Sequence, residues 1–480
     1  MNIFAYFKQK DIDTLDPKFY RQIEVWRSWY YSNVRKFHKY KVYRGNGTSV
    51  NCIRYALGMA KHVCEDMADL LLNERVTITI ANEATDEFVK QVLKANTFGE
   101  LGNEYQEWKS ALGTVAYVVH IKDSVIDEAG NMKGGTVGIN YVEAANIFPT
   151  SWQNKVITDC IFTFHKTHNR KKYVHFQYHK LEDVPGENRK QYVIENSIVE
   201  NTTGAGKELE PEQWNEIPVF CGLAERMETN SDKPLFIIDR LNLVNNVDED
   251  STNPMGVSLF ANAIDTIKKL DLEYDSYANE FSLGRKRIFV APEFLTMQDG
   301  SAVFDPEDTV FYELPEDYFK NSESKEAMHE VNMELRIDEH SKALNDDLNW
   351  LSLKCGFGTD RYKFENGGVK TATEVISENS DMYRSLTKHE LILERVLIQL
   401  IQTIIRAGIS IGIPGLVENT DITIAFDDSI IEDKTTERQS DRQDVSMGVM
   451  GLAEYRAKWY GETLEQAQKN LPEQASVMPE

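Results

Sequence analysis

The chain has 480 residues, of which 41% are apolar and 27% charged, a composition that is typical of a folded protein and excludes general disorder. Its 77 acidic and 53 basic side chains give a formal charge of −24, which argues against tight, sequence-independent binding to duplex DNA. At roughly 150 residues per domain, about three modules are expected. The five scattered cysteines form no CxxC pair and are expected to be reduced thiols in a cytosolic setting.

The N-terminal quarter of the chain is predicted to be mainly helical. Residues 17–42, rich in Trp, Tyr and basic side chains, are expected to form one helix that GNGT at 45–48 ends. Residues 50–73 are expected to form the next helix, because apolar side chains recur there at steps of three and four. The remaining predictions are a strand at 76–80 (VTITI) and helices near 84–96 and 99–112.

From about residue 113 to residue 240 the pattern changes to short alternating runs, which predict β-strands. Asn, Asp, Gly and Lys residues separate these runs, as they do in turns. The runs are TVAYVVHI, TVGINYV, VITDCIFTFHK, KKYVHFQYHK and QYVIENSIV. Together with the preceding helices they predict an α+β module with an antiparallel sheet.

Two long helices are predicted on either side of a small β-rich insert. After the polar break DEDSTNPMG, a helix is expected over 256–284, which at 1.5 Å per residue spans roughly 40 Å. Residues 285–324 contain the strand-like runs IFVAPEFL, SAVFD and TVFYEL. A second helix is expected over 325–353, where leucines recur on one side.

A third long helix is predicted to follow a glycine-containing segment at 354–370. Thr371 and Glu374 match a capping box, in which the Thr hydroxyl and the Glu carboxylate bond free N–H groups at a helix start. The apolar run at 391–413 belongs to this helix, and its interspersed Glu, Gln and Arg favour a buried or oligomer-facing helix over a membrane span. The predictions for the rest of the chain are the strand DITIAF and short helices near 450–459 and 463–470.

Groups of histidines and carboxylates occur, but none matches a catalytic or metal-binding signature. TTGAGKE lacks the first Gly and the final hydroxyl residue of a phosphate-binding loop. Histidines near Cys160 leave zinc as an alternative to a plain surface hairpin, and polar residues before Ser251 leave a cation site as an alternative to a solvated linker. These groups are His165, His168, His175 and His179, and Asn246, Asp248 and Asp250. Adjacent acidic residues occur at Asp338-Glu339, Asp346-Asp347 and Asp427-Asp428. Adjacent side chains on a helix do not point to one place, as the carboxylates of a two-metal nuclease must. No enzyme, metal or cofactor is predicted.

Two groups of basic residues are candidate contact sites in this acidic chain. The first group, Arg285, Lys286 and Arg287, follows the first long helix and either faces the helix dipole or contacts a nucleic acid or partner. The second group lies in the glycine-containing segment, where a mobile loop with few cations suits transient phosphate contact better than tight binding. It consists of the cations Arg361, Lys363 and Lys370 together with the uncharged loop residues Asn366, Gly367 and Gly368. An ordinary exposed loop is the alternative.

Five stretches, in this order, are similar to the portal proteins of tailed bacteriophages, in particular the siphovirus type of Gram-positive hosts. MADLLLNERVTI resembles that family's helix-to-strand junction, and NPMGVSLFANAIDTIKKLDLEYDSYANEFSLGRKRIFV its first stem helix running into the clip. ELRIDEHSKALNDDLNWLSLKCGFG resembles the returning stem helix. GGVKTATEVISENSDMYRSL resembles the end of the tunnel loop and the start of the long wing helix, and DITIAFDDSIIEDKTTERQSD the strand that leads to the crown.

The resemblance implies the portal fold, an α+β fold with long stem and wing helices, an antiparallel β wing module, a small α/β clip and a short helical crown. The implied divisions are a wing at 1–255, a first stem helix at 256–284, a clip at 285–324, a second stem helix at 325–353, a tunnel loop at 354–370, a long wing helix and strand at 371–428, and a crown at 429–480.

The resemblance also implies a function. Copies of the chain, expected to form a dodecamer, would make a ring at one capsid vertex, and double-stranded DNA would pass through its channel during packaging and ejection. The implied partners are the terminase large subunit, head-completion or adaptor proteins, the major capsid protein and the scaffolding protein, with no membrane. The expected location is the virion, with assembly in the host cytoplasm. The alternative is another ring-forming or scaffold-type phage head protein without a DNA channel.

Overall fold

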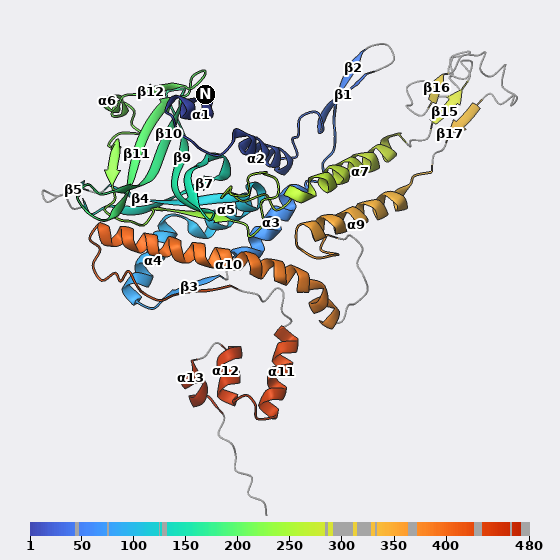
Figure 1. Cartoon of the computed structure of the whole chain (residues 1–480). Coiled ribbons are helices and arrows are strands. Elements are labelled where there is room, and N and C mark those ends of the chain that lie inside the picture. The colour runs from blue at the N-terminus through green and yellow to red at the C-terminus, as the bar shows by residue number, and fades with distance from the viewer. Residues whose placement is uncertain are drawn as a thin grey trace, which may run out of the picture.

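The computed structural model describes most of the chain, with gaps between the described segments. The described residues are 1–43, 48–73, 76–123, 125–126, 132–283, 287–290, 311–313, 328–331, 334–362, 372–426, 434–460 and 463–471. Figure 1 shows a body of helices and β-sheets, from which two long helices extend toward a small sheet, while short C-terminal helices lie below the body. This arrangement confirms the predicted α+β class.

Capping residues fix the starts of several N-terminal helices. Asn2, Asp16 and Asn82 each accept a backbone N–H from the first turn of the helix that follows. The predicted helices near 84–96 and 99–112 are confirmed. The helices of this part are α1 (Ile3–Gln9), α2 (Pro17–Tyr30), α3 (Met59–Leu71), α4 (Glu83–Ala95) and α5 (Phe98–Leu112).

A β-hairpin corrects the prediction of uninterrupted helices over 17–42 and 50–73. Helix α2 ends at Tyr30, and the positive φ angles of Ser32 (48°) and Lys36 (70°) prevent its continuation. Strands β1 (Lys39–Tyr43) and β2 (Ser49–Ile53) then pair in antiparallel register. Gly58, in the left-handed conformation at φ 74°, separates this hairpin from α3.

The predicted antiparallel strands are confirmed and form two main sheets. One sheet has the order β14-β4-β7, and the other has the order β12-β11-β10-β9-β8, with β13 also paired to β11. The β8–β9 and β9–β10 turns place Asn154–Lys155 and Asn169–Arg170 at positive φ, as two-residue hairpin turns require. The strands are β4 (Thr114–Lys122), β7 (Thr136–Glu143), β8 (Ile147–Gln153), β9 (Val156–His168), β10 (Lys171–Asp183), β11 (Lys190–Glu200), β12 (Lys207–Leu209), β13 (Arg226–Glu228) and β14 (Phe236–Arg240). Short elements are β5 (Val125–Ile126), β6 (Met132–Lys133), η1 (Ala144–Asn146) and α6 (Pro211–Trp214).

The two predicted long helices around the β-rich insert are present but shorter than predicted. The first, α7 (Ile264–Leu283), follows the single turn η2 (Ala261–Ala263) and does not begin at residue 256. Its predicted start is wrong because residues 256–260 bond to the end of α5 and the start of β4. Leu259 N–H donates to the Ser110 carbonyl of α5, and Gly256 N–H donates to Thr114 Oγ1 of β4, both at 2.8 Å.

The second long helix begins at residue 337 because a strand occupies part of the segment predicted as its first turns. Strand β17 (Met328–Val331) pairs antiparallel with β15 (Arg287–Val290), and β16 (Phe311–Glu313) pairs parallel with the other edge of β15. Helix α9 (Ile337–Lys354) then returns beside α7 (Figure 1). The β-rich insert is therefore confirmed, but it takes its third described strand from beyond residue 324; the predicted run SAVFD lies outside the described residues.

Helix α10 (Ala372–Ser410) is the longest described element and packs on strands β14 and β4. Leu393, Leu397 and Ile404 are fully buried along its inner side, while Arg395 and Gln399 face solvent, which confirms the buried-helix interpretation. None of the helices in the described residues combines the length and apolar character that a membrane span needs. The strand that follows, β18 (Ile422–Ala425), pairs with β3 (Thr77–Ile80).

The C-terminal helices include one that was not predicted. Helices α12 (Leu452–Tyr460) and α13 (Leu464–Lys469) confirm the two predicted short helices, and α11 (Lys434–Ser446) precedes them. The sequence of α11, KTTERQSDRQDVS, has almost no apolar residues, so no periodic stripe marks it as a helix.

Candidate functional site

Helices α7 and α9 lie side by side and are joined by both apolar and polar contacts. Ile267, Leu270 and Leu348 are buried between the helices and the body. At the end nearest the body, Lys269 Nζ lies 2.8 Å from Asp347 Oδ2, and Lys354 Nζ donates to Thr266 Oγ1 at 2.8 Å. These contacts fix the register of the two helices where they leave the body.

At the end of the helix pair that is farthest from the body, a bidentate ion pair joins the two helices. Arg336, immediately before α9, places Nε 3.0 Å from Glu280 Oε1 and Nη2 2.8 Å from Oε2. These hydrogen bonds lower the pKa of the Glu280 carboxyl to about 2. This ion pair lies where the chain enters and leaves the small β15–β17 sheet. It therefore holds together the ends of α7 and α9 that are nearest the sheet.

The chain after α9, here called the loop root (residues 355–362), is packed tightly on the body. Gly356 has φ 84°, and a side chain there would overlap the Ser385 hydroxyl of α10. Cys355 and Phe357 are buried, with 3% and 2% of their surface exposed. The loop root therefore leaves α9 in direct contact with α10, the helix to which the chain returns after residue 371.

Helix α3 holds the other half of the loop root. Arg361 Nε lies 3.3 Å from Asp66 Oδ2. The centroid of the Tyr362 ring lies 5.3 Å from the centroid of the His62 ring and 5.8 Å from that of the Phe357 ring. Burial raises the pKa of the Tyr362 hydroxyl above its ordinary value, with Asp66 adding to the effect. The expected tunnel loop thus starts from a fixed point on the body.

Most of the predicted contact residues lie outside the described part of the chain. Of the expected loop cations, Arg361 is described and contacts Asp66 in the loop root. Arg287 begins strand β15, opposite Val331. Glu374 lies in the first turns of α10, which begins directly after Thr371. The predicted residues outside the described segments are Arg285, Lys286, Lys363, Asn366, Gly367, Gly368, Lys370 and Thr371.

The residues considered for metal sites have other surroundings. Among the described residues, no group of three His, Cys, Asp or Glu side chains could hold a metal ion. His179 lies between the rings of Phe162 and Phe236, 5.4 Å from each. Asp250 Oδ1 accepts the backbone N–H and the hydroxyl of Thr252, as in an ordinary turn.

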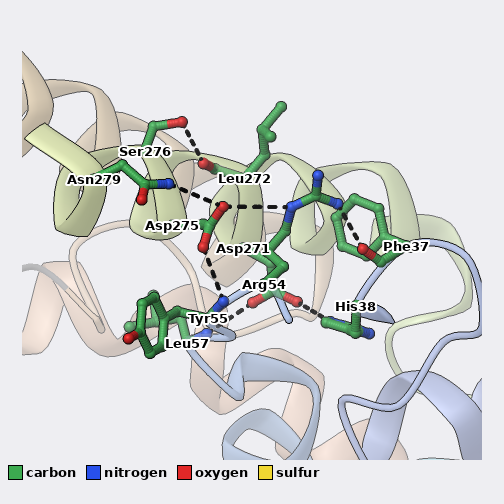
Figure 2. Close-up of polar contacts among 10 residues, drawn as sticks. All are labelled: Phe37, His38, Arg54, Tyr55, Leu57, Asp271, Leu272, Asp275, Ser276 and Asn279. Atoms are coloured by element: carbon green, nitrogen blue, oxygen red, sulfur yellow. Dashed lines mark hydrogen bonds and ion pairs between the residues drawn. The ribbon is translucent and has the colours of Figure 1, made fainter. Parts of the chain in front are cut away.

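A buried polar network that sequence reasoning missed attaches the β1–β2 hairpin to α7. Figure 2 shows Asp271 and Asp275 of α7 pointing toward the chain on either side of the hairpin. His38 Nε2 lies 3.0 Å from Asp271 Oδ2, and Leu57 N–H donates to Asp271 Oδ1 at 2.8 Å. Val34 N–H donates to His38 Nδ1, so a neutral His38 carries its proton on Nε2 and donates it to Asp271.

Asp275 holds the chain segment that follows strand β2. It accepts the Tyr55 N–H at 3.0 Å and lies 3.8 Å from Arg54 Nε. Arg54 in turn donates to the Phe37 carbonyl at 2.8 Å and stacks on the Phe37 ring. The only signal in the sequence is the spacing of the two aspartates by one helical turn, which alone would not indicate their distant partners.

Comparison with known proteins identifies the family of the chain. A family model described as phage portal protein, SPP1 Gp6-like, matches residues 9–474, almost the whole chain. No curated protein sequence matches the chain. The family match includes the body, the α7–α9 helix pair, the loop root and the C-terminal helices. Because the match extends over far more than half of the sequence, the chain belongs to the phage portal protein family, SPP1 Gp6-like.

Proposed function

We propose that copies of this portal protein form a ring, dodecameric in the assembled head, around a channel through which double-stranded DNA is packaged and ejected. The observation that carries the proposal is the loop root: the chain up to residue 362 is fixed on the body by Arg361–Asp66, and helix α10 begins at Ala372. In this proposal, residues 363–371 reach into the channel while the loop root stays in the ring body.

The acidic charge of the chain favours DNA that slides through the channel over DNA that is bound tightly. Each copy contributes a formal charge of −24. Acidic walls repel DNA phosphates over about one Debye length, roughly 8 Å at physiological salt. Tight binding to duplex DNA requires phosphate neutralisation by Lys and Arg, so an acidic channel keeps DNA free to move. In this proposal Lys363 and Lys370 are weak guides rather than anchors.

The small β15–β17 sheet is the proposed docking platform. It lies at the far end of the α7–α9 pair, away from the body (Figure 1). We assign to it the successive binding of the terminase large subunit and the head-completion or adaptor proteins. The body would face the major capsid protein and the scaffolding protein during assembly in the host cytoplasm.

Electron microscopy of the purified protein, with native mass spectrometry on the same sample, tests the ring. Rings with a central hole wide enough for duplex DNA and a mass of about twelve copies are expected. Rings without such a hole would favour a phage head structural protein that has no DNA channel. A monodisperse monomer at every protein, salt and magnesium concentration would contradict the proposal.

The loop is tested separately in particles that already contain the ring. Lys363→Glu and Lys370→Glu should leave ring mass unchanged and lower the amount of packaged DNA, because the guides become repulsive. Lys155→Glu, at the β8–β9 turn of the body, is the matched control for charge reversal. Equal packaging by the loop variants and the control would contradict a role of the loop in DNA contact.

A further inference from the structure

The β1–β2 hairpin (residues 39–53) stands away from the body and exposes apolar side chains on a two-stranded ribbon. Figure 1 shows it projecting beside α7, apart from the main sheets. Tyr43 and Ile53 are about three-quarters exposed, at 75% and 74%, and Val42 and Val50 are also exposed. An isolated hairpin is marginally stable in water, and its outer strand edges are open to pairing. The hairpin therefore has the properties of a surface that another chain covers.

The base of this ribbon is held by groups that are costly to bury. His38, Asp271 and Asp275 are 2%, 2% and 6% exposed, and they form the network of Figure 2. Buried charged or polar groups are tolerated only when they are paired, so the network fixes the position of the base. A fixed base and exposed apolar side chains along strands β1 and β2, from Ile53 at the base to Tyr43 at the last described pair, together describe an arm with a defined direction.

The charge of the arm is opposite to that of the chain that carries it. Between Glu24 and Glu65 the sequence contains no acidic residue. Basic residues in that segment include Arg35, Lys36, Lys39 and Lys41, whereas the whole chain has 77 acidic and 53 basic side chains. A second copy of this chain therefore offers the arm a surface that is predominantly of complementary charge.

We propose that the β1–β2 hairpin is an assembly arm that packs its apolar side chains and basic strand on a second copy of this chain. The proposal deepens the proposed ring and rests on it. A neighbouring copy fits better than DNA, because phosphates would select the lysines but give no reason for the exposure of Val42, Val50 and Ile53. The arm also lies on the α7 side of the helix pair, whereas the loop root follows α9 (Figure 1).

Hydrogen exchange of the wild-type chain, as free subunit and as ring, is the first test. The amides of residues 39–43 and 49–53 should exchange at least roughly tenfold more slowly in the ring, because the strands are covered there. Equal exchange in subunit and ring would overturn the arm while leaving the ring intact. Protection that appears only when duplex DNA is added would also overturn it and assign the hairpin to DNA.

A pair of substitutions tests the apolar contact. Tyr43→Ser with Ile53→Ser should raise the protein concentration needed for half-assembly by roughly tenfold or more, with the melting temperature of the subunit unchanged. Val156→Ser, which alters a 64% exposed valine at the start of β9, is the matched control and should assemble as the wild type does. Assembly of the double variant at the wild-type concentration would overturn the proposal.

Zero-length cross-linking identifies the second copy directly. Rings assembled from equal amounts of ¹⁴N and ¹⁵N chains are treated with a carbodiimide, which joins lysine amines to carboxylates. Lys39 or Lys41 should be joined to Asp or Glu residues in mixed-isotope pairs. Links only within one copy would overturn the arm. A chain that remains monomeric under all conditions would overturn both the arm and the ring.

Discussion

Lys109 of helix α5 and Asp239 of strand β14 form an ion pair in the interior of the body. Lys109 Nζ lies 3.1 Å from each Asp239 carboxylate oxygen, and the two side chains are 1% and 0% exposed. Gln106 Nε2 donates to the same carboxylate at 2.8 Å. Burial lowers the pKa of Lys109, and the adjacent carboxylate opposes that shift. The pair joins helix α5 to the β14-β4-β7 sheet.

Removing one partner of this pair should destabilise the fold strongly. Asp239→Asn leaves the Lys109 ammonium buried without a counter-charge, which typically costs about 3–5 kcal/mol of unfolding free energy. Chemical denaturation of the free subunit measures the loss. Lys90→Gln, which breaks the exposed Lys90–Asp86 pair, should change stability by less than about 1 kcal/mol. Equal effects of the two substitutions would show that Lys109 is not held by charge pairing.

Gly256→Ala should disrupt the junction between the body and α7. The new Cβ would overlap the Gly113 carbonyl oxygen, and on the opposite side a Cβ on Gly113 would lie 2.6 Å from the Gly256 backbone. Because both neighbours are backbone, we expect a loss of roughly 3 kcal/mol or more, seen as a lower melting temperature. Gly99→Ala, in helix α5 with open space around it, should stabilise the protein slightly. A neutral Gly256→Ala would contradict the close packing.

The buried imidazole of His179 should make the fold sensitive to acid. Burial lowers its pKa from 6.5 to about 3, and among the described residues neither ring nitrogen has a hydrogen-bond partner. Below pH 6.5 the unfolded chain binds a proton that the folded chain does not, so stability is lost as pH falls from 6.5 toward 3. Between pH 6.5 and 5 this one residue should account for roughly 1–2 kcal/mol.

His179→Phe provides the comparison for that effect. Phe keeps the ring between Phe162 and Phe236 but cannot take up a proton. Denaturation curves at pH 7.5, 6.5 and 5 should show a smaller loss of stability with acid than in the wild type, while the value at pH 7.5 stays similar. An unchanged pH dependence would mean that other groups cause the acid sensitivity.

The start of α10 provides a prediction about where the loop ends. Thr371→Ala should cost about 1 kcal/mol of local helix stability, because the expected N-cap hydroxyl is lost. Hydrogen exchange should become faster at residues 372–376 and stay unchanged near residue 400, in the buried part of the helix. Thr371→Ser, which retains a hydroxyl, is the control. Identical exchange in all three proteins would exclude capping by Thr371.

Tyr362→Ala should loosen the loop root without preventing assembly. The substitution removes the ring that packs on His62 and Phe357, so exchange at residues 355–362 should become faster. Ring mass should be unchanged and DNA packaging reduced. Tyr460→Ala, at an exposed tyrosine of α12, is the control for loss of an aromatic side chain. Normal DNA packaging by a variant with faster exchange in the loop root would show that packaging does not depend on a rigid loop root.

The elements that sequence patterns predicted well are those whose signal is local. Strands β9 and β10 alternate and are joined by Asn169–Arg170 at positive φ, and α10 carries a long apolar stripe. Strand β17 was assigned to a helix because its stabilising partner, β15, is distant in the sequence. The hairpin was missed for a similar reason, since KYKVY gives too short a signal to distinguish a strand from a helix face.

The contacts of the candidate site could not be predicted from the sequence. The Gly-containing segment before Thr371 and the capping pattern predict a loop that ends where α10 begins, and this stays a prediction because residues 363–371 lie outside the described part of the chain. Arg361, by contrast, was expected among the loop cations, and its contact with Asp66 joins residues 295 positions apart. Contacts of that kind depend on how α3, α9 and α10 pack, and no local spacing specifies them.

The ion pair between Glu280 and Arg336 has a consequence for exchange of parts between related proteins. It brings together the two points where the chain departs for the small sheet and comes back, so the described strands β15, β16 and β17 lie between two residues that are held side by side. If the proposed docking at the small sheet is correct, a graft between these two residues should exchange the docking specificity of one portal protein for that of another. The recipient would keep its own body, loop and arm, because none of their described anchors lies inside the grafted segment.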